Sequence, residues 1–135
     1  RNFNEPLDGI VYGVFVSLGF AWAENVIYVT HPILGGYETA LERALLSVPG
    51  HGLFGVRMGY YFALGKYRNR KRYLPLAFFS PYLAHALYNY FLLKREPVFW
   101  LFFSVLEVRL WVFGLKRIKE LQNCSPFREK VSKES

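Results

Sequence analysis

Four long apolar segments, separated by short polar connections, dominate the pattern of hydrophobic and polar positions along the chain. They cover residues 7–29, 40–65, 74–93 and 98–115. A helix advances about 1.5 Å per residue and the hydrocarbon core of a bilayer is about 30 Å thick, so about 20 apolar residues span it. We therefore predict an all-α fold, a polytopic membrane helical bundle with about four transmembrane helices.

Proline and glycine shape these segments further. Pro49 removes one backbone donor and clashes with the preceding turn, so we expect a kink near residues 45–49 of the second segment. Small residues allow the backbones of neighbouring membrane helices to approach closely. The glycines that we expect to serve this purpose are Gly9, Gly13, Gly19, Gly55 and Gly59.

The distribution of charge predicts an orientation in the membrane. The chain has 17 Lys and Arg against 10 Asp and Glu, a formal net charge of +7. The densest basic stretch, residues 66–72, connects the second and third apolar segments, and further basic residues follow from Lys116. Because short cytoplasmic loops are rich in Lys and Arg, we place this loop and both termini in the cytoplasm. We expect no nucleic-acid partner, since the basic residues do not line one helical face.

We expect one domain followed by a tail. Residues 1–118 are the predicted helical transmembrane domain, and residues 119–135 are a basic polar C-terminal tail that we expect to be disordered. The single cysteine, Cys124, lies in this tail, so a disulfide framework within the chain is excluded.

A few polar side chains interrupt the apolar segments. Glu24 stands beside Asn25 in the first segment, which has no Lys or Arg between residues 7 and 29. An ionisable group at membrane depth costs roughly 2.5–3.5 kcal/mol, so we expect it to be functional and to have polar partners. Counted from the cytoplasmic ends, Glu24 and the partners that we name for it lie about 16–25 Å across the membrane. These partners are His51, His85 and Asn89.

The side chains of Glu24, His51 and His85 make a candidate metal site. Two imidazoles and a carboxylate are an ordinary ligand set for Zn²⁺, and three protein ligands leave a fourth position for water. Bound zinc lowers the pKa of that water to about 7. The alternative is a buried hydrogen-bonded network that fixes helix packing. Arg57 and Glu107 each need an opposite charge, so we also expect these two to form a buried pair.

Several motifs resemble the PrsW family of intramembrane proteases. The first apolar segment contributes Asp8-Gly9-Ile10-Val11-Tyr12-Gly13, then Gly19-Phe20-Ala21-Trp22-Ala23-Glu24-Asn25, and Tyr28. The next contributes Arg43, Ser47-Val-Pro49-Gly-His51-Gly-Leu-Phe-Gly55 and Met58-Gly59-Tyr60-Tyr61, and the one after it His85-Ala-Leu-Tyr-Asn89. The resemblance covers roughly residues 5–92. It extends more distantly to the CAAX prenyl endopeptidases and to the multi-pass scaffold subunit of gamma-secretase.

The resemblance implies a metal-dependent intramembrane endopeptidase that cuts a membrane-bound regulatory protein such as an anti-sigma factor. It implies that Glu24, His51, His85 and Asn89 line the active site, with both histidines as metal ligands or catalytic groups. Asn89 would orient a ligand or stabilise a developing oxyanion. The implied partners are a single-pass membrane protein and the lipid bilayer. The implied location is the bacterial inner membrane, which the chain would cross several times.

The chain departs from the family in one respect. Members carry a Glu-Glu-x-x-Lys motif on the helix before the Asp8-Gly9 segment, and its glutamates are proposed to activate the water. Glu5 is the only acid upstream of Asp8, so we expect the helices with this motif to precede the present segment, and we assign no general base. The alternative function is a catalytically inactive membrane scaffold or helix-binding module of the same superfamily. A transporter is disfavoured, because four spans are few and no inverted repeat is visible.

Overall fold

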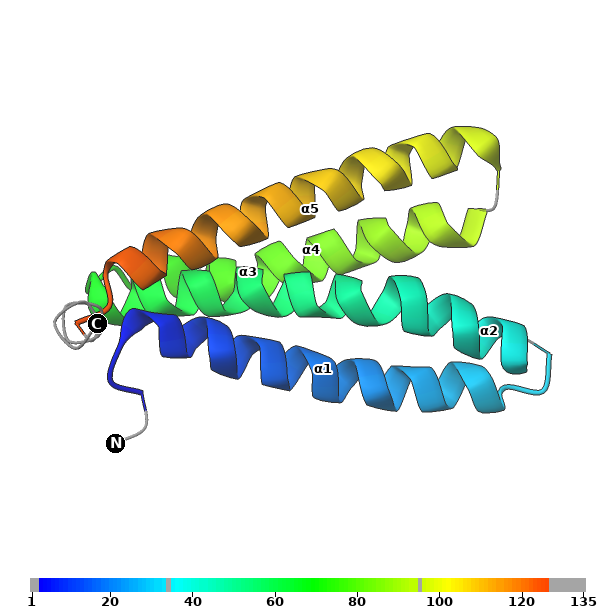
Figure 1. Cartoon of the computed structure of the whole chain (residues 1–135), viewed down its shortest axis with the longest axis horizontal. Helices are drawn as coiled ribbons and strands as arrows, with labels where there is room; N and C mark the ends of the chain where they lie inside the picture. The colour runs from blue at the N-terminus through cyan, green and yellow to red at the C-terminus, as the bar shows by residue number, and fades with distance from the viewer. Residues whose placement is uncertain (1–2, 34, 95, 127–135) are drawn as a thin grey trace, which may run out of the picture.

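The computed structural model describes residues 3–33, 35–94 and 96–126, and within these ranges all elements are helices (Figure 1). The prediction of an all-α fold is therefore confirmed. The four predicted segments correspond to α1, to a continuous run of α2, η1 and α3, to α4 and to α5. In chain order the elements are α1 (Pro6–Thr30), α2 (Tyr37–Glu42), the π-helical segment η1 (Arg43–Ser47), α3 (Val48–Tyr67), α4 (Tyr73–Lys94) and α5 (Pro97–Asn123).

Local sequence signals fix where α1 begins and where the chain turns back. Pro6 occupies the first turn, where its missing N–H is harmless. The Asp8 Oδ2 atom accepts hydrogen bonds from the backbone N–H groups of Asn4 at 2.8 Å and Glu5 at 3.0 Å. After α1, Gly36 has a φ of 123°, a conformation that favours glycine. The chain thus reverses, and α3 runs back along α1 (Figure 1).

Helix α3 is the central helix, and its contact with α1 is a contact between two backbones. A Cβ atom added at Gly13 would lie 2.5 Å from the carbonyl oxygen of Gly55, and one at Gly59 would lie 2.1 Å from that of Gly9. The predicted close approach is confirmed at these four glycines. It is wrong for Gly19, whose added Cβ would have nothing within 4 Å. Gly19 lies on the face of α1 that is turned away from α3.

The irregularity expected near Pro49 is present as a π-helical segment. The backbone N–H of Val48 donates to the carbonyl of Arg43, five residues back, so η1 has one extra residue per turn. The hydroxyl of Tyr88 donates to the carbonyl of Leu46 at 2.7 Å. The distortion begins at residue 43, two residues earlier than predicted. It leaves Arg43 and Ser47 buried on the inner side.

The buried core of the molecule is small, and much of its surface is apolar. Two buried clusters hold α3 to its neighbours, one around Tyr60 and one around Phe54 and Tyr88. Large apolar side chains remain exposed along α1, α4 and α5, Trp22 and Phe78 among them. Within the described residues, α1 and α5 are long and apolar enough to cross a membrane. The helices α3 and α4 have polar residues such as His51 and Asn89 within their length.

The first and last described turns lie at one end of the molecule. Lys66 Nζ donates to the carbonyl of Phe3 at 3.0 Å, and the Ser125 hydroxyl donates to the Glu5 carboxylate. Helix α5 continues to Asn123, five residues beyond the predicted end of the domain at residue 118. The tail that was predicted to be disordered, residues 119–135, is therefore helical as far as Asn123, and its residues 127–135 lie outside the described part of the chain.

Candidate functional site

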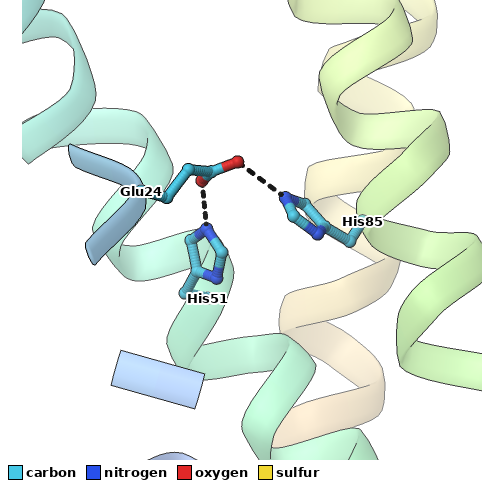
Figure 2. A group of neighbouring side chains, drawn as sticks. All are labelled: Glu24, His51 and His85. Atoms are coloured by element: carbon cyan, nitrogen blue, oxygen red, sulfur yellow. Dashed lines mark hydrogen bonds and ion pairs between the residues drawn. The ribbon is translucent and has the colours of Figure 1, made fainter. Parts of the chain in front are cut away.

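Three helices bring Glu24, His51 and His85 together. Figure 2 shows the carboxylate of Glu24, from α1, between the imidazoles of His51 on α3 and His85 on α4. Glu24 Oε2 lies 2.9 Å from His51 Nε2, and Glu24 Oε1 lies 3.6 Å from His85 Nε2. One ligand atom from each residue lies within 4.8 Å of the others. The structure thus assembles the three residues that were predicted as metal ligands, and we call them the triad.

The contact between α1 and α3 fixes the register of the two helices and so places Glu24 opposite His51. Gly13, Ser17 and Glu24 follow helical spacing on one face of α1. The Ser17 hydroxyl donates to the carbonyl of His51 at 2.7 Å. Because Gly13 touches α3 and Ser17 binds the residue that carries the imidazole, Glu24 can reach that imidazole two turns later. His51 itself is buried.

Asn89, the fourth predicted residue, lies beside the triad. It follows His85 by one turn of α4, and its Nδ2 atom lies 2.9 Å from His85 Nε2. The same ring nitrogen also faces Glu24 Oε1 at 3.6 Å, so the tautomer of the imidazole decides which of the two neighbours it bonds. The unprotonated form of an imidazole is the one that binds a metal. When this nitrogen is unprotonated it can accept from Asn89 or bind a metal, and Asn89 lies against the same atom that faces Glu24.

Arg43 is a further residue of the site, and it was not among the predicted ones. Its Nη2 atom donates to Glu24 Oε2 at 2.7 Å and to the Ser47 hydroxyl at 3.1 Å. Its Nε atom donates to Asn25 Oδ1 at 2.7 Å, and its guanidinium stacks 4.0 Å from the centre of the Tyr28 ring. Arg43 thus balances the charge of Glu24 and holds it by one oxygen. One sequence signal could have identified it: the apolar segment that carries Glu24 contains no Lys or Arg, so the balancing cation must come from another segment.

Aromatic rings surround the two imidazoles. The ring centres of His51 and His85 are 4.8 Å apart. Phe54 lies 5.6 Å from His51 and 5.3 Å from His85, and Phe20 lies 5.8 Å and 5.9 Å from them. Phe54 is buried, whereas Phe20 is 58% exposed and forms the outer wall. Apolar walls lower the local dielectric constant, so the polar contacts inside are stronger than they would be in water.

The donor set fits a zinc ion. Ligand atoms at zinc bond lengths of about 2.0–2.2 Å in a tetrahedron lie about 3.3 Å apart. The observed separations are 2.9 Å from Oε2 to His51 Nε2 and 3.6 Å from Oε1 to His85 Nε2, so each imidazole lies near this distance from a different carboxylate oxygen. Arg43 and His51 both contact Oε2, so Oε1 is the carboxylate oxygen that faces His85. Small shifts of the side chains would bring two imidazole nitrogens and Oε1 around one ion.

The expected pair of Arg57 and Glu107 is wrong. Arg57 Nε donates to the Ser80 hydroxyl, and its guanidinium lies 4.7 Å from the centre of the Phe113 ring. Glu107 instead accepts a hydrogen bond from the indole of Trp111 at 2.9 Å. The need for an opposite charge did not predict the partners. Arg57 contacts a hydroxyl and an aromatic face. Glu107 bonds an indole through Oε1, while its Oε2 is buried without a hydrogen-bond partner among the described residues.

Comparison with known proteins identifies relatives of this chain. The profile of a family described as PrsW family intramembrane metalloprotease matches residues 1–114. Protease PrsW of Geobacillus kaustophilus is 42% identical over 121 residues, which are 87% of this chain and 52% of the relative. Protease PrsW of Oceanobacillus iheyensis is 43% identical over 88% of this chain and 54% of its own length. Protease PrsW of Bacillus subtilis is 39% identical over 90% and 56%.

The chain spans about half the length of the curated relatives that it matches. No solved structure matches it.

Proposed function

The chain belongs to the PrsW family of intramembrane metalloproteases, and on this premise we propose that it carries the metal-binding part of an endopeptidase that cuts a membrane protein within the bilayer. The observation that supports this most directly is the convergence of Glu24, His51 and His85 from three helices. Soluble cores also contain histidines, but a carboxylate and two imidazoles at mutual ligand distance are the set that a hydrolytic zinc site requires.

We extend this proposal to the topology, with α1, the run from α2 to α3, α4 and α5 each crossing the membrane. Helix α4 supports it, because its exposed side chains include Phe78, Phe79, Tyr82 and Leu83. A water-soluble protein rarely exposes so large an apolar patch. The basic loop at residues 66–72 lies at the same end as both described termini (Figure 1). The positive-inside rule then places this end in the bacterial cytoplasm.

In this proposal each residue of the site has a separate task. A bound Zn²⁺ would supply a water with a pKa of about 7 and polarise the carbonyl of the substrate. His51 and His85 hold the ion through ring nitrogens, and Glu24 completes the set through Oε1. Arg43 fixes the orientation of the carboxylate through Oε2. Asn89 orients His85 and offers an amide N–H to the oxygen of the scissile carbonyl, where charge develops.

The substrate that we propose is a single-pass membrane protein of the anti-sigma factor class. Access to the site would come from the side of α1 and α4. The side chains of Glu24 and His85 keep 14% and 22% exposure, whereas that of His51 has 3%. Phe20, on the same side, is exposed and contacts both imidazoles. A substrate helix that displaced this ring would bring its backbone to His85 first.

The test is cleavage of a tagged single-pass anti-sigma factor that is co-expressed in the same membrane. We expect Glu24→Gln, His51→Ala and His85→Ala to abolish the cleavage product while the protein still appears in the membrane fraction. The matched control is His31→Ala, because this histidine lies in the connection after α1 and its Nδ1 accepts from the Ile33 backbone. Cleavage that persists in all three site variants would contradict the proposal.

The second candidate is an inactive scaffold of the same family, and one observation favours it. Arg43 and Asn89 already satisfy Glu24 and His85 with hydrogen bonds, so the network is complete without an ion. A scaffold would show partner binding without a cleavage product. Its site variants would lose folding or partner binding, and wild-type protein would contain no metal.

A further inference from the structure

A long open groove lies between α4 and α5, on the face of α4 opposite the triad. Its volume is about 910 Å³. On α4 it is lined by Leu76, Ser80, Leu83 and Leu87, which share one helical stripe. His85 lies two residues from Leu83 and Leu87 and therefore points about 160° away. The groove is separate from the proposed metal site and has no role in the proposed chemistry.

The polar lining of the groove is cationic. Its charged residues are Arg57, Arg109, Lys116 and Arg117, and no Asp or Glu lines it. Arg117 has a partner, Glu120, at 2.5 Å. The ion pairs among the described residues include none that involves Arg57, Arg109 or Lys116. A cation in an apolar groove without an opposite charge is unfavourable, so the lining is complementary to an anion.

Three of the four cationic residues lie toward one end of the groove. Arg57 lies nine residues before Lys66, about 13 Å from the basic end. Its guanidinium extends back to the ring of Phe113, one helical turn before Arg117. The half nearest the basic loop therefore collects Arg57, Lys116 and Arg117. The other half is lined mainly by aliphatic side chains, namely Leu83, Leu87 and Leu106, and it also contains Arg109, one turn before Phe113 on α5.

We propose that this groove binds one anionic phospholipid. Its phosphate would lie against Arg57, Ser80 and Lys116, and its acyl chains would follow the aliphatic half between α4 and α5. Basic pockets between helices on the cytoplasmic side are a known way to bind anionic lipids. A zwitterionic lipid carries a cation of its own, which four Lys and Arg side chains would repel. A second protein helix would need an acidic residue at the depth of Arg57.

The first test compares lipid binding in the purified full chain by native mass spectrometry, with equal amounts of phosphatidylglycerol and phosphatidylcholine. We expect wild-type protein to retain phosphatidylglycerol at least about fivefold over phosphatidylcholine, in line with lipid recognition by basic pockets. Arg57→Met with Lys116→Gln should remove this preference. The matched control is Arg70→Gln with Lys71→Gln, which removes two charges from the basic loop outside the groove. Equal retention of both lipids by wild type, or the same loss in the control pair, would overturn the proposal.

A second pair of variants leaves every charge in place. Leu83→Trp fills the aliphatic half of the groove, whereas Leu101→Trp changes a residue of α5 outside it with similar exposure, 64% against 60%. We expect only Leu83→Trp to lower phosphatidylglycerol retention. A photo-crosslinking residue at Val112, which lines the groove, should then form adducts with lipid in native membranes. Adducts with a protein at this position would overturn the proposal in favour of a helix as the occupant.

Discussion

At the scale of single residues, the site is organised by how the two oxygens of Glu24 are used. Oε2 receives hydrogen bonds from Arg43 and His51, and Oε1 faces His85. The guanidinium also bonds Asn25, so the adjacent acid and amide of α1 are held by one side chain. The arginine fork makes this possible, because its donors have a fixed planar geometry that an ammonium lacks.

We predict that Arg43 and Glu24 are energetically coupled. Arg43→Gln leaves a carboxylate without its charge partner and should lower the free energy of unfolding by about 3 kcal/mol, as expected for breaking a buried pair. In the double variant with Glu24→Gln the loss should be smaller than the sum of the two single losses, by about 1–3 kcal/mol. Reversible unfolding in mixed micelles measures these values.

The conservative change Arg43→Lys serves as the control for charge. It keeps a cation but loses the simultaneous bonds to Glu24 and Asn25, so its stability should lie between those of wild type and Arg43→Gln. Additive losses within about 0.5 kcal/mol in the double variant would show that the two residues act independently.

The sequence was sufficient to propose which polar residues of the site meet. It was insufficient to identify Arg43, the residue that holds Glu24 in place. Glu24, His51, His85 and Asn89 could be named because polar groups are scarce in apolar segments and lie at similar depths. Their roles as ligands and catalytic groups stay predictions. The inward position of Arg43 was not predicted, since the residue stands near the mouth of its segment and its turn is the π-helical segment η1, where it is buried.

At the scale of elements, the approach of α1 to α3 determines whether the site exists at all. The two helices touch through glycine backbones, and about three turns after Gly13 Glu24 meets His51. A methyl group added at one of these glycines would push the two helices apart. The carboxylate would then lose contact with a partner that is itself fixed in the centre of the molecule.

We predict that Gly13→Ala is destabilising, because its Cβ would lie 2.5 Å from the carbonyl oxygen of Gly55 and 2.8 Å from the backbone nitrogen of Gly59. The expected loss of stability is about 1–3 kcal/mol, as for other overpacked sites. The measurement is the midpoint of thermal unfolding in detergent.

Gly19→Ala on the same helix is the matched control for this change. Nothing lies within 4 Å of its added Cβ, and alanine favours a helix over glycine by up to about 1 kcal/mol. Its midpoint should therefore be unchanged or slightly higher. A similar decrease in both variants would mean that helix flexibility, and not close approach, explains the glycines.

Element positions followed from the apolar pattern more reliably than contacts did. The four predicted segments match the helices to within about three residues, except that the second is divided into α2, η1 and α3 and that α5 continues eight residues beyond the fourth, to Asn123. Gly19 was wrongly assigned to the contact between α1 and α3. It is a glycine of the same helix as Gly9 and Gly13, but it lies on a different face of α1. The Arg57–Glu107 pair failed for a related reason, since local partners on α4 and α5 were available to each residue.

At the scale of the whole molecule, one end is basic and the other carries the triad. The loop at residues 66–72 and both described termini share the basic end, and the proposed lipid groove has its cations there. The triad lies toward the opposite end, where η1 and the connection between α1 and α2 are found. In the proposed orientation the site is in the outer half of the bilayer.

We predict opposite accessibility for the two ends. Cys124 is exposed just after α5, so an impermeant maleimide should label it in inverted membrane vesicles and not in intact spheroplasts. In a Cys124→Ser background, Ile33→Cys should be labelled in spheroplasts, because Ile33 is 86% exposed in the connection after α1. Labelling of both positions from the same side would contradict the proposed topology.

The most direct test of the central claim is the metal content of the detergent-purified protein, measured by elemental analysis for wild type and three histidine variants. We predict close to one zinc per chain in wild type and in His31→Ala, and loss of the metal in His51→Ala and His85→Ala. Well-folded wild type without metal, or a metal retained by both site variants, would contradict the assignment of Glu24, His51 and His85 as a metal centre.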